Sequence, residues 1–87
     1  MGSNIGQVKQ QVNQIGAQAK AVSGQLTQLA NGLSKNISIV DAAIGGTAGG
    51  EDKRIISSIQ AAINDLKEAA AAMQEASQAA AQWVGRA

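Results

Sequence analysis

Residues 41–55 read DAAIGGTAGGEDKRI, and this stretch decides the fold. It places four glycines (Gly45, Gly46, Gly49 and Gly50) within six residues, and glycine clusters of this kind mark turns. A long apolar repeat reaches the glycines from each side. We therefore predict that residues 45–50 form the bend between two helices that pack on each other.

The spacing of Gly45 and Gly50 also fits a phosphate-binding loop. Such a loop needs a Lys and a Ser or Thr directly after its last glycine. Here Glu51 and Asp52 follow instead, and their negative charges would repel a phosphate. We therefore predict a turn at this stretch and no bound cofactor.

Before the glycines, apolar residues recur at alternating steps of three and four, which is typical of a helix that packs along its whole length. The repeat comprises Ile5, Val8, Val12, Ile15, Ala19, Val22, Leu26, Leu29, Leu33, Asn36, Val40 and Ala43. Asn31-Gly32 is a turn signal that allows a kink near 31–37. Because the repeat keeps its register beyond that pair, we predict one continuous helix over about 5–44.

After the glycines, a second repeat predicts a helix over about 51–84. It comprises Ile56, Ile59, Ile63, Leu66, Ala70, Met73, Ser77, Ala80 and Val84, with an adjacent stripe of Ile55, Ala62, Ala69, Ala76 and Trp83. Glu51 and Asp52 fall in its first turn, where the helix dipole favours acidic residues. Gly85 follows the last repeat residue, in the position of a C-terminal cap.

Two long helices joined by a short bend must lie antiparallel, so the sequence predicts an all-α hairpin that forms a single domain over 1–87. Counting outward from the bend places Val40 near Ile55, Leu33 near Ile63, Leu29 near Leu66, Val22 near Met73, Gly16 near Ala79 and Val12 near Trp83. A chain of 87 residues is marginally stable alone, and much of its second helix is alanine. We therefore expect a dimer or a helical partner to complete a four-helix bundle.

The composition argues against several functions. The chain has no Cys, His, Tyr or Phe, which removes the usual metal ligands and general bases and leaves Trp83 as the one aromatic residue. The acidic residues Asp65, Glu68 and Glu75 fit a solvated helix face. We therefore predict a non-enzymatic protein with no metal site and no small-molecule substrate.

Charge and hydropathy limit the partner and the location. A net charge of +1 without a basic stripe argues against nucleic acid. The longest apolar run, Ala69 to Met73, is too short for stable membrane insertion. No conventional signal peptide is visible at the N-terminus, so a cytoplasmic location before any export is expected.

Two single residues each allow two interpretations. Trp83 either anchors a partner or closes the open end of the hairpin against Val8 and Val12. Asn36 either sets register from a buried position or faces water beyond a bend near Gly32. The candidate partner-binding residues are Trp83, Val84, Ala72, Ala76, Ala79, Ala80, Val8 and Val12.

A short Ala- and Gln-rich chain with two long helices around a glycine bend resembles the Trp-x-Gly (ESAT-like) family of small helical hairpins exported by type VII secretion systems. Two family motifs are missing. The bend contains no Trp, since Trp83-Val84-Gly85 lies at the far end of the second helix, and the C-terminal Tyr-x-x-x-Asp/Glu signal is absent. The chain looks closer to divergent relatives without these motifs, which are encoded beside secreted polymorphic toxins and pair with the helical leader of the toxin.

The resemblance implies dimerisation and no catalysis, with a role as a partner, chaperone or targeting factor for a secreted effector. The alternative from the residues themselves is a self-assembling structural subunit of a filament or needle-like assembly. The small net charge and the Gln-rich surface of the first helix would permit close lateral association.

Overall fold

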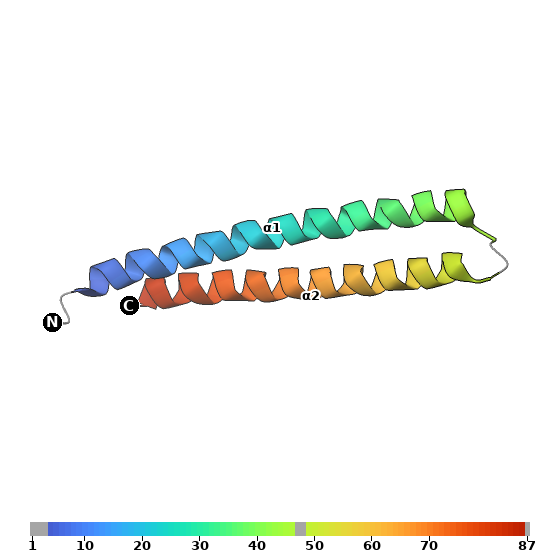
Figure 1. Cartoon of the computed structure of the whole chain (residues 1–87). Helices are drawn as coiled ribbons and strands as arrows, with labels where there is room; N and C mark the ends of the chain where they lie inside the picture. Colours follow the sequence, from blue (N-terminus) through green and yellow to red (C-terminus); the bar gives the residue numbers. More distant parts are fainter. Residues whose placement is uncertain (1–3, 47–48, 87) are drawn as a thin grey trace.

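The computed structural model describes residues 4–46 and 49–86, and they form an antiparallel hairpin of two helices (Figure 1). Helix α1 spans Ile5–Ile44 and helix α2 spans Glu51–Arg86. The molecule measures 69 × 17 × 14 Å. Its radius of gyration is 19.6 Å, whereas a compact domain of this length would have roughly 12 Å. The hairpin is therefore a long rod with a single interhelical layer.

Helix α1 is continuous through Asn31 and Gly32, without the kink that the turn signal allowed. Helix α2 extends two residues beyond the expected end at 84, so the prediction that Gly85 caps it is wrong. A glycine inside a helix costs only about 1 kcal/mol relative to alanine. Arg86 lies in the last turn, where the helix dipole favours a positive charge, and this offsets part of that cost.

The bend depends on glycine at three positions. Gly46 and Gly50 have φ values of 82° and 77°, in the left-handed region that side chains disfavour. The Gly45 N–H donates to the Asp41 carbonyl oxygen at 2.8 Å, and a Cβ at Gly45 would collide with that oxygen. Thr47 and Ala48, also part of the predicted bend, lie outside the described residues.

Asp52 closes the bend from the second helix. Its carboxylate is buried, and its Oδ2 accepts a hydrogen bond from the Gly46 N–H at 3.1 Å. The sequence analysis placed Asp52 correctly in the first turn of α2, but it predicted only a favourable interaction with the helix dipole. The side chain also ties the end of α1 to the start of α2, across six residues of chain.

The inner seam is the set of buried and half-buried residues with which each helix faces the other. In α2 it comprises Asp52, Ile56, Ile59, Ile63, Leu66, Ala70, Met73, Ser77, Ala80 and Val84. The nine residues of the predicted repeat are all among them. The direction in which α2 faces was therefore predicted correctly.

In α1 seven of the twelve residues of the predicted repeat lie outside the inner seam, so that part of the prediction is wrong. The inner seam comprises Lys9, Val12, Gly16, Ala19, Ser23, Leu26, Ala30, Leu33, Ile37 and Val40. Gly16, Ser23 and Ala30 therefore face α2 where Ile15, Val22 and Leu29 were expected, and those three larger residues are exposed.

Small inward residues let the two helices approach closely. A Cβ added at Gly16 would lie 3.0 Å from the Ala80 Cβ and 3.6 Å from the Ser77 carbonyl oxygen. Ala80 is one position from Ala79, the neighbour predicted for Gly16. The buried Ser23 hydroxyl donates to the Ala70 carbonyl oxygen at 2.9 Å. A hydroxyl in this position both fits the narrow gap and has its hydrogen bond satisfied.

The position of Asn36 follows from the same rotation of α1. Asn36 is exposed, and Ile37 takes the half-buried position facing α2. Asn36 thus faces outward although α1 does not bend near Gly32.

Candidate interaction surface

Each helix carries a second row of mostly apolar residues that the hairpin leaves exposed, which we call its outer stripe. The outer stripe of α1 comprises Val8, Ile15, Val22, Leu29, Asn36 and Ala43, and that of α2 comprises Ile55, Ala62, Ala69, Ala76 and Trp83. Ile15 is 59% exposed and Leu29 is 57% exposed. Large aliphatic side chains recurring in this way at every seventh residue form a contiguous row, unlike scattered surface apolar residues.

Both outer stripes lie on the same side of the hairpin. In α1 every stripe residue except Ala43 directly precedes an inward one, as Ile15 precedes Gly16. In α2 the same step holds, as Ala69 precedes Ala70. Because the helices run in opposite directions, an equal rotation about each axis turns both stripes toward one common face. We call this common surface the apolar face.

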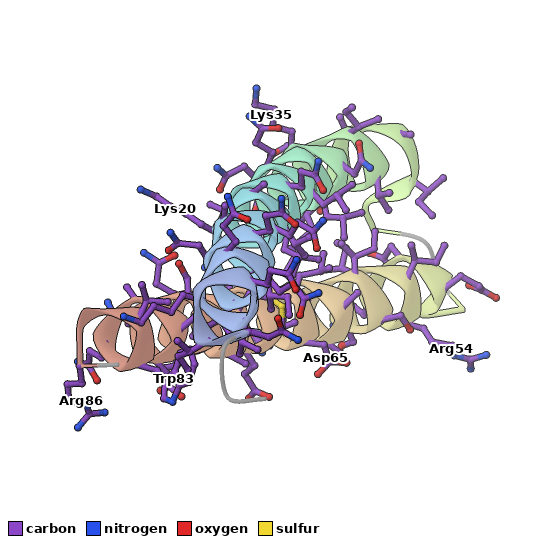
Figure 2. All side chains as sticks on the ribbon, turned by 90° about the vertical axis from the view of Figure 1, so that its left-hand side faces the viewer. Lys20, Lys35, Arg54, Asp65, Trp83 and Arg86 are labelled. Carbon is purple, nitrogen blue, oxygen red and sulfur yellow. The ribbon has the colours of Figure 1, made fainter. Side chains whose placement is uncertain are left out.

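The opposite side of the hairpin is polar. It presents the residues that directly follow inward ones, namely Asn13, Lys20, Thr27, Ser34 and Asp41 in α1, and Lys53, Gln60, Lys67, Gln74 and Ala81 in α2. Figure 2, viewed from the open end, shows Lys20 above the α2 ribbon and Trp83 below it. The hairpin therefore separates an apolar face from a polar one along its whole length.

An open groove of about 500 Å³ lies on the apolar face. It is lined by Gln25, Gln28, Leu29, Gly32, Leu33 and Asn36, all from α1. The space at Gly32 is open, since a Cβ there would have no neighbour within 4 Å. A depression on one helix beside a row of aliphatic side chains fits a side chain of a partner helix better than an enclosed ligand.

The two outer stripes differ in size. The α1 stripe carries four aliphatic side chains, from Val8 to Leu29, whereas the middle of the α2 stripe is alanine. Larger residues stand at the ends of the α2 stripe, where Ile55 is 41% exposed near the bend and Trp83 is 37% exposed near the open end. The apolar face therefore has a high ridge on α1 and a low one on α2.

The eight predicted partner-binding residues separate into two groups. Val8, Ala76 and Trp83 belong to the outer stripes, and Ala72 and Ala79 are exposed. Val12, Ala80 and Val84 are half-buried in the inner seam, so they pack between the two helices of the hairpin.

The prediction missed four exposed aliphatic residues of the outer stripes, namely Ile15, Val22 and Leu29 of α1 and Ile55 of α2. A signal for the first three was available. Gly16, Ser23 and Ala30, each one residue later, form an alternative inward row with the same seven-residue spacing.

Within the described ranges, 4–46 and 49–86, no group of three or more acidic residues is placed to hold a metal ion. Neither helix is apolar enough over its length to cross a membrane.

Comparison with protein-family models, with curated proteins and with solved structures gives no match. The helical hairpin agrees in architecture with the Trp-x-Gly resemblance, but no family match supports membership.

Proposed function

We propose that this hairpin is a non-enzymatic interaction module that completes a four-helix bundle with a helical partner through its apolar face. One observation carries the proposal. Large side chains such as Ile15 and Leu29 stay more than half exposed in a continuous row, while the charged Lys20 and Lys67 lie on the other side. A helix pair with one apolar face gains stability when a second pair covers that face.

The partner class follows from the shape of the surface. The apolar face is long, straight and ridged at heptad spacing, which matches the side-chain rows of another helix or helical hairpin. The wider biological proposal is a partner, chaperone or targeting factor for a secreted effector. It rests on the architectural resemblance and on the absence of other chemistry in the sequence.

Site-specific photo-crosslinking tests the interaction module. A photoreactive residue at position 29 lies on the apolar face, and the same residue at position 34, five residues further along α1, lies on the polar face. In cells that produce the protein, position 29 should crosslink to a helical protein or to a second copy of the chain, and position 34 should not. Equal yields at both positions would contradict the proposal.

A charge substitution gives an independent test on purified protein. Leu29→Asp should abolish association measured by light scattering, because a carboxylate would be buried without a partner. The matched control, Ser34→Asp, should leave association unchanged. Equal association of both variants would show that the apolar face is not the contact surface.

The alternative function is a self-assembling structural subunit. The observation that favours it is Ile39, which is 63% exposed beside the outer stripe and would remain at the edge of a closed bundle. Growth without a defined end in light scattering would support this alternative, whereas a closed complex of fixed mass would support the module.

A further inference from the structure

We propose that the partner on the apolar face is a second copy of this chain, bound parallel, with both bends at the same end and α1 of each copy packed on α2 of the other. This inference rests on the proposed function, since it names the partner and the geometry for the same surface. It requires a two-fold axis that runs along the length of the rod.

The exposed area is the first argument. The chain has an accessible surface of 6137 Å² at a mass of 8.8 kDa, whereas a compact protein of that mass exposes roughly 4,800 Å². The excess is larger than the roughly 800 Å² that each partner buries in a standard stable interface. One face-to-face contact of standard size with a similar rod would remove more than half of it.

The second argument is the stagger of the two outer stripes. Gly16 packs between Ser77 and Ala80, which fixes the relative level of the two helices. Counting by single residues from there, Val22 lies level with a point midway between Ala69 and Ala76. Each large residue of the α1 stripe therefore lies level with a gap in the α2 stripe.

A two-fold axis along the rod keeps every residue at its own level. In that arrangement Val22 of one copy enters the gap between Ala69 and Ala76 of the other, and Ile15 enters the gap between Ala76 and Trp83. The symmetry also repeats each of these contacts in reverse. Interdigitation of this kind is the packing of helix knobs into facing holes.

The third argument is the difference in height between the stripes. In the parallel dimer the large side chains of the α1 stripe meet the alanines of the α2 stripe on both sides of the interface. The distance between facing helices is therefore the same on both sides. In an antiparallel dimer α1 would face α1 and α2 would face α2. High ridges would then hold the hairpins apart on one side while alanines faced alanines on the other.

Charge is compatible with the same arrangement. The exposed row beside the α1 stripe comprises Gln11, Gln18, Gln25, Gly32 and Ile39 and carries no charge. The corresponding row of α2 carries Glu51, Asp65 and Arg86. In the parallel dimer these charges meet the uncharged row of the other copy, so no like charges oppose each other.

Spin-label distances test the orientation, and the absence of cysteine allows single labels without background. Gln7→Cys and Ala42→Cys place a nitroxide on exposed α1 positions near the open end and near the bend. In a parallel dimer, the two labels at the same residue of the two copies lie at the same level, on opposite sides of a bundle whose helices are about 8–10 Å apart. The two labels at each position should therefore be about 30 Å apart. In an antiparallel dimer at least one like pair would be separated by about 50 Å or more along the axis.

The wild-type mass measured by light scattering completes the test. A mass of twice 8.8 kDa is expected. The dipolar signal between the two spin labels should disappear when labelled chain is diluted with unlabelled chain. Like-pair distances near 50 Å would overturn the parallel geometry. A monomer in solution would overturn the second copy as the partner, yet crosslinking of position 29 to another helical protein would still support the proposed interaction module.

Discussion

Gly16 and Gly24 form a matched pair that measures how closely the helices pack. Both lie inside α1, but only Gly16 faces α2. A Cβ at Gly16 would lie 3.0 Å from the Ala80 Cβ, whereas one at Gly24 would meet nothing within 4 Å. The substitutions Gly16→Ala and Gly24→Ala therefore make the same local change in two different surroundings.

The expected magnitudes follow from two opposing effects. Alanine is better than glycine in a helix by about 0.8–1.0 kcal/mol, and both variants gain this amount. At Gly16 the new methyl group is closer to Ala80 than the 3.5–4.0 Å of an ordinary carbon contact, and overpacking typically costs about 1–3 kcal/mol. Gly24→Ala should therefore stabilise by about 1 kcal/mol, and Gly16→Ala should be neutral or destabilising by up to about 2 kcal/mol.

Urea unfolding followed by helical circular dichroism measures both free energies. Protein concentration must be held equal, because association adds a concentration-dependent contribution to stability. Ala80→Gly provides the internal control, since it should cost less in the Gly16→Ala background than in the wild type. Equal stabilisation by Gly16→Ala and Gly24→Ala would refute the close approach of the helices at this level.

Three further outcomes are expected. Ser23→Ala should lower the unfolding free energy by about 1 kcal/mol through loss of the bond to Ala70, and an unchanged urea midpoint would count against that bond. Asp52→Ala should cost about 1–3 kcal/mol and speed amide exchange at Gly46, whose N–H loses a carboxylate acceptor; unchanged exchange would contradict the tie across the bend. Trp83 is the single aromatic reporter, and its emission should shift to shorter wavelength as rising concentration drives association and buries the ring; a constant spectrum across the association range would place it outside the interface.

The inward face of α2 was predictable because its largest side chains and its contacts coincide. Ile59, Ile63 and Leu66 dominate the first half of the helix, and apolar periodicity orients them inward. The bend was predictable for a related reason, since glycines at 46 and 50 adopt backbone angles that other residues disfavour.

The inward face of α1 was not predictable from periodicity alone. Two inward seams are possible, and both contain Val12, Ala19, Leu26 and Leu33. The first seam adds the residue three positions after each of these, and the second adds the residue four positions after each. Hydrophobicity favours the first, because it contains Ile15 and Leu29. Close helix approach and the Ser23 hydrogen bond favour the second, and these depend on the facing surface of α2.

The candidate surface was missed for the same reason. A rule that places the largest apolar residues in the core of a single chain assigns Ile15, Val22 and Leu29 to the interior. If another chain buries these residues, the rule is right that they are buried but wrong about which helix covers them. Sequence patterns of this type thus predict which residues avoid water, without specifying which helix covers them.

Both described chain ends, near Ile5 and Arg86, lie at the same end of the rod, opposite the bend (Figure 1). Force applied to these two ends would act across the seam and not along it, so each helical turn would separate before the next one carried load. Among the first contacts to part are those of small residues such as Gly16 and Ala80, which hold little apolar area. The hairpin should therefore unzip at low force from its open end, with Asp52 and the bend among the last elements to yield.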